Sequence, residues 1–342
     1  MKQKKIALLL TFIILLTTIL GGCSPKDQKE NIGSNTVDND TKVEDGGTEK
    51  KEENPSRIFA LKGPTAMGLI KLFKDIDNGE ENYTYTIGNS PEEAIAAIGG
   101  GKADILTIPG NMAASIYNKN KNLKIAGINT LGVLYFASSG DEIHSFDELK
   151  GKTILLSGKG ATPEFALKVL LKESNLSEED VTLEFKSEHT EVVQGLGENP
   201  SSIGLLPQPF LTVATTKNDS LHPIFDLNNS WKEYFDHDMV TGVVVVTKDF
   251  AENHPEKVRD FLEKYKESVY FVNENIDEAS ELIGSYDIFP TPVAKKAIPY
   301  CNIVMIDGEE MEKTCDTYFK ALFEVEPKAV GGMVPDGEIY FK

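Results

Sequence analysis

Short apolar runs alternate with segments of helical periodicity from Arg57 onward, and this rhythm constrains the fold more than any other feature. Residues 57–61 and 83–87 are expected strands, and residues 65–77 between them carry apolar side chains at helical spacing. A third expected strand, residues 104–108, stops at a proline before a further helix. Strands that alternate with helices are typical of a mostly parallel, doubly wound sheet, so the predicted fold class is α/β.

The alternation restarts after residues 146–152 and builds a second unit. Its expected strands are 153–156, 181–185 and 202–206. Residues 242–247 form a strongly apolar strand, which we assign back to the first unit. The pattern also predicts strands 123–128 and 132–137, a helix from the Ser90-Pro91-Glu92-Glu93 capping box to Gly99, a helix starting at Pro163, a long helix 255–273, and helices broken at Pro290, Pro292 and Pro299.

Two pairs of loops match between the units. Residues 61–65 and 157–162 each give a strand end, a glycine turn and a threonine at a helix start. Residues 108–111 and 206–209 each give a strand, a proline and a polar residue. The folded part is longer than one core usually supports. The sequence therefore predicts two lobes with equivalent loops, the first made of residues 57–138 and 242–342 and the second of residues 139–241.

The matched loops are candidate ligand contacts, because ligands of an open parallel sheet bind beyond the carboxyl ends of its strands. Gly63 and Gly160 allow close approach of the backbone to a ligand. Thr65 and Thr162 either donate to a ligand or cap their helices, whose N-termini favour an anion or a carbonyl oxygen.

Other polar and aromatic residues near these loops have two interpretations each. Asn111 and Gln208 offer amides to a ligand, or serve as a helix cap and a solvated surface residue. Lys62 and Lys159 pair with an anion, or are solvated. Trp231 stacks on a flat ligand, or packs in the core.

Catalytic and metal-binding patterns are missing from the sequence. It has no Gly-x-Ser-x-Gly, His-Glu-x-x-His or phosphate-loop motif, and its five histidines lack ligand spacing, so no metal or cofactor is expected. Asp236-His237-Asp238 is interpreted as a solvated turn. The formal net charge of −19 argues against nucleic acid as a partner. Cys301 and Cys315 either form a disulfide or remain free thiols.

The N-terminal segment resembles a bacterial lipoprotein signal. Residues 1–5 are basic, residues 6–20 are uncharged and mostly apolar, and Leu20-Gly21-Gly22 precedes Cys23. The resemblance implies a signal peptide over residues 1–22 and lipidation of Cys23 by a diacylglyceryl group, with palmitate among its acyl chains. Residues 23–56 are polar and are expected to form a disordered tether. The alternatives are an ordinary secreted protein and a transmembrane anchor, for which the apolar run is short.

This signal, together with the Phe-Asp-Glu-Leu-Lys-Gly-Lys string at residues 146–152, resembles the solute-binding lipoproteins of bacterial ABC importers. Residues 60–69, Ala103-Asp104-Ile105 and the Pro-Asp-Gly ending near Pro335 are similar to the nitrate/sulfonate/taurine and thiamine-pyrimidine-precursor group. The resemblance implies a type II-like periplasmic-binding-protein fold, whose two lobes close on a ligand about a hinge. It implies as ligand-binding residues Gly63, Pro64, Thr65, Pro109, Gly110, Asn111, Thr130, Gly132, Gly160, Ala161, Thr162, Pro207 and Gln208.

The resemblance also implies how such a protein is used. It implies a monomer, lipid-anchored on the extracytoplasmic face of the cell membrane, that delivers a small solute to an ABC permease. An enzyme branch of the fold carries a cysteine-rich run that this sequence lacks, so no enzyme activity is expected. An extracellular enzyme and a sensor or adhesive lipoprotein are the alternatives. The loop chemistry favours a small organic anion or a neutral heteroaromatic solute over a polyamine or a metal.

Replacement of Cys23 by serine tests the lipid anchor. The substitution removes the thiol that would carry the lipid, so the protein should leave the membrane fraction or remain unprocessed. Fractionation with a radiolabelled fatty acid measures both results. A Cys23→Ser protein that stays membrane-bound and labelled would exclude the lipoprotein interpretation.

Overall fold

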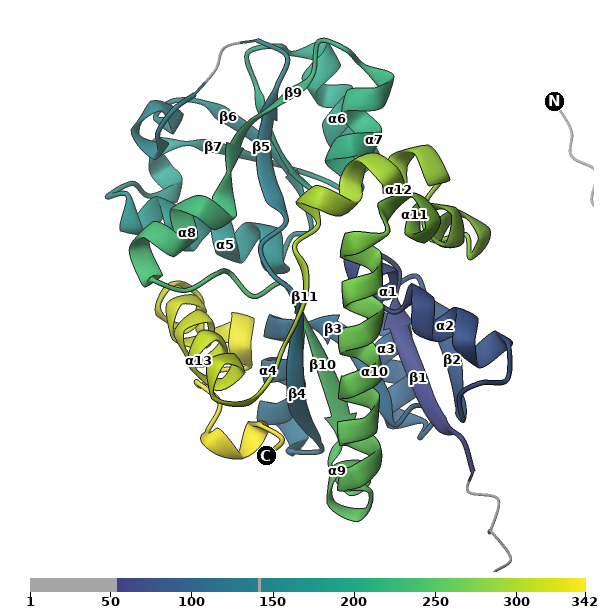
Figure 1. Ribbon diagram of the computed structural model, residues 1–342. Helices are drawn as coiled ribbons and strands as arrows, with labels where there is room; N and C mark the ends of the chain where they lie inside the picture. The colour runs from purple at the N-terminus through teal and green to yellow at the C-terminus, as the bar shows by residue number, and fades with distance from the viewer. Residues whose placement is uncertain (1–53, 141–142) are drawn as a thin grey trace, which may run out of the picture. The chain divides into compact units, whose positions relative to one another are not determined.

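Two β-sheets organise the part of the chain that the computed structural model describes, residues 54–140 and 143–342 (Figure 1). The first has the order β11-β4-β10-β3-β1-β2 and the second the order β7-β6-β8-β5-β9. The first sheet consists of β1 (Ser56–Leu61), β2 (Tyr83–Gly88), β3 (Ile105–Pro109), β4 (Leu123–Thr130), β10 (Gly242–Thr247) and β11 (Ile303–Ile306). The second consists of β5 (Leu134–Ser138), β6 (Thr153–Ser157), β7 (Thr182–Lys186), β8 (Ile203–Pro207) and β9 (His222–Asp226).

Each sheet, with the helices packed on it, forms one lobe, and the α/β prediction is confirmed. The first lobe contains α1 (Pro64–Met67), α2 (Ile70–Asp77), α3 (Pro91–Gly99), α4 (Gly110–Asn120), α9 (Lys248–Asn253), α10 (Pro255–Glu274), α11 (Ile276–Ser285), α12 (Thr291–Ala297), α13 (Gly308–Val325) and the 3-10 turns η3 (Ile298–Tyr300), η4 (Pro327–Val330) and η5 (Gly337–Ile339). The second contains η1 (Phe146–Leu149), α5 (Thr162–Glu173), η2 (Glu178–Asp180), α6 (His189–Glu198), α7 (Phe210–Lys217) and α8 (Leu227–Phe235).

The sheets are mixed, because β10 and β5, which each follow a crossing between lobes, and also β11 run antiparallel to their neighbours β4, β3 or β8. β1 pairs in parallel with β2 and β3, and β6 pairs in parallel with β7 and β8, as the sequence predicts. β10 is antiparallel to both β3 and β4, and β5 is antiparallel to β8 and β9. A chain that returns from the other lobe enters the sheet at the edge where β3 and β4 end, which fixes the direction of β10.

Two sequence expectations differ from the structure in their details. The strand expected at residues 132–137 is β5, and it belongs to the second sheet, so the first crossing falls between β4 and β5. The single helix expected over residues 65–77 is divided into α1 and α2. Gly68, at the division, lies so close to Tyr265 and Ile303 that an added Cβ would meet both at 3.0–3.1 Å. This contact fixes where the chain bends.

The hydrophobic core continues from one lobe into the other. One cluster joins α4 and α13 of the first lobe to α5 and α8 of the second. Trp231 on α8 lies fully buried within it, with its ring 5.5 Å from that of Tyr318 on α13. Trp231 is therefore a packing residue. A second cluster lies on the other face of the first sheet, beneath α2 and α10.

Several sequence features fall outside the described residues, namely the signal segment 1–22, Cys23 and residues 24–53 of the expected tether. The final residue of that expected tether, Ser56, already belongs to β1. Within residues 54–140 and 143–342, no helix combines the length and apolar character needed to cross a membrane.

Cys301 and Cys315 are free, buried thiols on opposite sides of the first sheet. Burial raises the pKa of each thiol, which slows its reaction further. We expect a Cys23→Ser variant to give two reactive thiols after unfolding without reductant, and almost none while folded. Titration with a chromogenic disulfide reagent measures both numbers. An unfolded sample without reactive thiols would instead show a disulfide.

Candidate functional site

The carboxyl edge of the first sheet brings three chain segments together where β3 and β4 end and β10 begins. Gly242 pairs with Pro109 on one side and with Thr130 on the other. The Thr241 amide donates to the Thr130 carbonyl at 3.0 Å, and the Gly110 amide donates to the Thr241 carbonyl at 3.1 Å. Three of the predicted ligand residues thus lie around a crossing strand.

Buried polar atoms without a hydrogen-bond partner gather at this edge. Asn129 is 0% exposed, and neither atom of its amide has a partner among the described residues. The Asn129 amide lies close enough to the Tyr265 hydroxyl to oppose the rise in pKa that burial causes there. The same lack of a partner holds for the hydroxyls of Thr107, Thr130 and Thr241. Because such an atom costs about 1–3 kcal/mol, this concentration points to a binding site.

Gly242 keeps the site open beside Asn129. A Cβ on Gly242 would lie 2.5 Å from Asn129 Oδ1 and 2.8 Å from Thr65 Cγ2. Asn129 and Thr65 therefore both pack against the backbone of Gly242 where a larger residue would place its Cβ. Sequence reasoning missed Asn129, which lies between the expected strand 123–128 and Thr130, and Gly242, which begins the expected strand 242–247.

One hydrogen bond joins the two lobes at the predicted loops. Thr162 Oγ1, in the first turn of α5, donates to Asn111 Oδ1, in the first turn of α4, at 3.0 Å. Neither Thr65 nor Thr162 caps its helix. Thr65 Oγ1 donates to the Leu61 carbonyl at 2.7 Å, and the N-cap position of α5 is Ala161. The structure thus brings Asn111 and Thr162 together from opposite lobes.

The N-terminus of α5 is already occupied by an acidic side chain. The Glu164 carboxylate accepts a hydrogen bond from the Gly160 amide at 2.6 Å and pairs with Lys168 at 2.8 Å. Burial acts to raise the pKa of Glu164, but the bonds from Lys168 and Gly160 outweigh it and lower the pKa. An ionised carboxylate therefore already lies in the first turn of α5, where its negative charge is favourable and disfavours a second anion nearby.

The two lysines of the glycine loops also have neighbours. Lys62 pairs with Asp287 at 3.7 Å. The Lys159 ammonium lies 5.3 Å from the centre of the Phe185 ring. Both contacts weaken the case for an anion held by these lysines.

An aromatic cluster spans the lobes on the side of α6 and α7. Ser157 Oγ, at the end of β6, lies 2.6 Å from Nδ1 of His189, the first residue of α6. The His189 ring packs on Phe210 of α7 at 4.4 Å, and Phe289 of the first lobe meets Phe210 edge-on at 5.7 Å. Burial lowers the pKa of His189 to about 4, so the imidazole is neutral at pH 7. No motif in the sequence pointed to this cluster.

The remaining predicted ligand residues differ in their burial and contacts. Gly63 is buried and has a φ of 140°, a conformation that favours glycine. The Gly132 carbonyl accepts from Asn302 Nδ2 at 2.5 Å. Gly160 is exposed. Pro64, Ala161 and Pro207 are partly buried, whereas Gln208 is buried and folds back onto Thr212.

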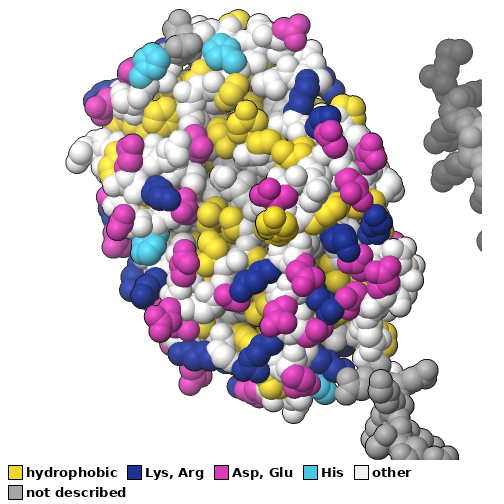
Figure 2. Space-filling view, in the orientation of Figure 1, with side chains coloured by type: hydrophobic (Ala, Val, Ile, Leu, Met, Phe, Trp, Pro, Cys, Tyr) yellow, Lys and Arg dark blue, Asp and Glu magenta, His cyan; other side chains and the backbone are white. Residues whose placement is uncertain are grey.

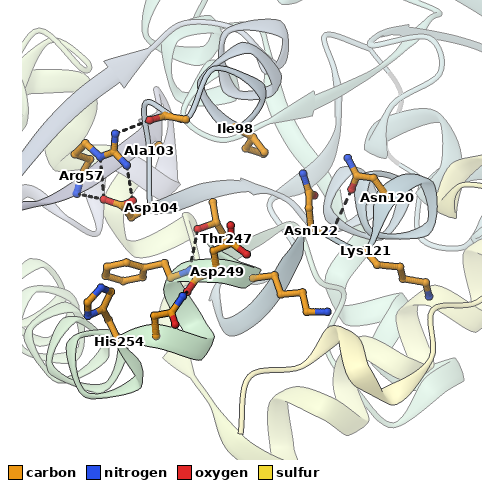
Figure 3. Close-up of a pocket in the computed structure, with 14 residues that line it drawn as sticks. Arg57, Ile98, Ala103, Asp104, Asn120, Lys121, Asn122, Thr247, Asp249 and His254 are labelled. Carbon is orange, nitrogen blue, oxygen red and sulfur yellow. Dashed lines mark hydrogen bonds and ion pairs between the residues drawn. The ribbon is translucent and has the colours of Figure 1, made fainter.

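A cavity of about 610 Å³ lies at the opposite, amino edge of the first sheet (Figure 3). Its Arg57 guanidinium is held by Asp104 at 2.6 and 3.0 Å and by the Gly101 carbonyl at 2.5 Å. None of the predicted ligand residues lines this cavity. The carboxyl edge, with its unpartnered polar atoms, is therefore the stronger candidate site.

A family model described as menaquinone biosynthesis matches residues 72–325. The chain belongs to this family. No curated protein matches the chain.

Solved structures share the fold across most of the chain. An ABC transporter protein from Parabacteroides distasonis is 22% identical, with 85% of this chain and 99% of that chain covered and a TM-score of 0.71. The periplasmic aliphatic sulphonate binding protein SsuA from Escherichia coli is 14% identical, with 82% and 91% covered and a TM-score of 0.66. The ligand-binding component of a Staphylococcus aureus ABC-type import system, solved with zinc bound, is 13% identical, with 84% and 98% covered and a TM-score of 0.62. The chain thus has the two-lobed periplasmic-binding-protein fold.

Replacement of His189 by asparagine should reduce the loss of stability on acidification. The unfolded chain binds a proton on this histidine near pH 6.5 and the folded chain only near pH 4, so the folded state loses stability as the pH falls through this window. Urea unfolding at pH 7 and pH 4.5 should show the wild type losing on the order of 2 kcal/mol more than the variant. His254→Asn, at an exposed position, is the control. Equal losses in wild type and His189→Asn would contradict this assignment.

Proposed function

We propose that this protein is an extracytoplasmic solute-binding lipoprotein that captures a small solute between its lobes and delivers it to an ABC permease. The observation that carries the proposal is the set of buried polar atoms without partners, around Asn129 and Thr130, at the edge that faces the second lobe. The hydrogen bond between Asn111 and Thr162 supports it, because it joins the predicted loops of both lobes. Ligand contacts from both lobes are the basis of hinge closure.

The chemistry of the edge favours a neutral heteroaromatic solute over a small organic anion. The unpartnered groups are an amide and hydroxyls, which suit ring nitrogens, carbonyls and amino groups. Glu164 occupies the start of α5, and Lys62 pairs with Asp287. The Phe210 and His189 rings beside the cleft add flat apolar surfaces for a planar ring.

The anchor and the partners of the proposal rest on the sequence and on the fold. Lipidation of Cys23 would hold the protein on the outer face of the cell membrane. Proteins that share its fold include an ABC transporter protein and sulphonate-binding proteins, which supports a binding role, and we propose that this chain acts as a monomer that hands its solute to a permease. Neither a cofactor nor catalysis is part of this proposal.

A second candidate function is an extracellular enzyme that uses the same cleft. The family's description as menaquinone biosynthesis favours it, and so does the contact of the Ser157 hydroxyl with the His189 imidazole, a base in reach of a hydroxyl. A binding protein releases its solute with an unchanged mass, whereas an enzyme converts it. Mass spectrometry of the released solute before and after incubation with the protein separates the two. A sensor would bind in the same way but lack a partner permease.

Substitution of Thr130 by valine tests the site directly. Valine keeps the shape of threonine and removes a buried hydroxyl that has no protein partner, so stability should be unchanged or slightly higher. Solute retained through purification should decrease about tenfold or more in native mass spectra, because its hydrogen bond is lost.

Ser202→Ala is the matched control, since it also removes a buried, unpartnered hydroxyl but lies at the start of β8. It should leave the retained solute unchanged. Equal retention by wild type, Thr130→Val and Ser202→Ala would move the site away from this edge.

A further inference from the structure

We propose a second binding site, for a small carboxylate with an apolar body, in a groove between the lobes beside α7. The groove has a volume of about 480 Å³, within the range of small-molecule sites. Its walls come from β5, α7 and β9 of the second lobe and from α12 and η3 of the first. Tyr135 Oη donates to the Tyr300 carbonyl at 3.2 Å, which ties the two walls together.

The lining of the groove suits an apolar chain. Leu211 lies buried at its base, and Pro223, Pro299 and the exposed Tyr300 add apolar surface. Threonines on the same side of α7 supply the polar part, and two of them, Thr215 and Thr216, donate their hydroxyls to the Thr212 carbonyl. Their methyl groups remain available for apolar contact. The space and its surface therefore fit a short alkyl or aryl group.

One positively charged side chain is part of this otherwise uncharged lining. Lys296 of α12 is the single charged side chain among the described residues that line the groove. No carboxylate of the described chain pairs with it, whereas the adjacent Lys295 is held by Asp277 at 2.6 Å. Because the protein as a whole carries a net charge of −19, an unpaired lysine at the rim makes this groove locally attractive to an anion.

Gln208 contributes a directed polar group to the same groove. Its Oε1 accepts two hydrogen bonds from Thr212, from the amide at 3.3 Å and from the hydroxyl at 2.8 Å. This pattern fixes the orientation of the side-chain amide and leaves the Nε2 hydrogens as donors for another partner. A ligand carboxylate near Lys296 would thus also accept a hydrogen bond from Gln208 Nε2.

The groove lies apart from the unpartnered polar atoms of the proposed solute site. Of the predicted ligand residues Gln208 lines it, whereas Asn111, Thr130 and Thr162 do not. Charged side chains of both signs are dense in the lower part of the space-filling view, and hydrophobic and uncharged side chains predominate near its middle (Figure 2).

Isothermal titration calorimetry with sodium octanoate tests the proposal, and 1-octanol serves as the uncharged probe of equal chain length. Lys296→Gln should weaken octanoate binding about three- to tenfold, between the effect of an exposed ion pair and that of a charge-assisted hydrogen bond. Lys295→Gln, the matched control, should leave it unchanged. Binding of 1-octanol should be insensitive to both changes.

A second variant tests the space itself. Thr216 is exposed on α7, so Thr216→Trp should fold normally by circular dichroism while filling the groove and removing the binding of both probes. Thr130→Val should not affect octanoate, so that failure of this proposal and failure of the cleft proposal are distinguishable. Equal effects of Lys295→Gln and Lys296→Gln, octanoate binding that survives Thr216→Trp, or no saturable binding to the wild type would each overturn the second site.

Discussion

The insertion of β10 between β3 and β4 is the constraint on which the rest of the molecule depends. Val243 and Val245 pack into one hydrophobic cluster, and Val244 and Val246 into the other, so the strand is buried on both faces. A strand in this position reads as a continuous apolar run, which is how it appears in the sequence. Its first residue lies where β3 and β4 end, and its antiparallel direction places the second crossing between the lobes at the candidate site.

The unpaired buried polar atoms of the candidate site lower the stability of the folded chain, and all of them belong to uncharged side chains. A folded chain usually pairs more than nine-tenths of its buried polar groups, and here several unpaired ones lie at the end of one sheet. Ligand-binding sites commonly contain such unpaired polar groups, because their hydrogen bonds form only when the ligand is bound. Glu164 is paired with Lys168 and Lys62 with Asp287, so the groups left without a partner at this edge are uncharged amides and hydroxyls.

Much of the architecture could be predicted from sequence, because strand and helix periods are local signals. The strand ends at Pro109 and Pro207 and the helix starts near Thr65 and Thr162 follow from prolines, glycines and apolar spacing. Strand direction is not a local property, which is why the antiparallel β5 was placed with the first lobe. The lobe boundaries and the ligand residues given by the sequence remain proposals.

The roles of individual side chains were harder to predict, because they depend on residues distant in sequence. Asn129 directly follows the expected strand 123–128, and its place beside Gly242 depends on the pairing of β4 with β10, which the local sequence does not show. His189 has no motif, and its contacts come from Ser157 and Phe210, 32 and 21 positions away. Gln208 was expected to offer its amide to a ligand or to be solvated, and in the structure it is buried, bonds to Thr212 of α7 and lines the groove beside that helix.

The carboxylate at the start of α5 has a consequence for how such proteins diversify. Glu164 supplies from within the chain the negative charge that the helix terminus favours, and Lys168 balances it from the next turn of the same helix. The charge at this helix start is therefore set by side chains of α5 itself, separate from the hydroxyls and amides of the proposed site. A single change at this position would open the helix terminus to an external anion while the scaffold stays the same. Descendants of one fold could in this way move between neutral and anionic solutes without rebuilding their lobes.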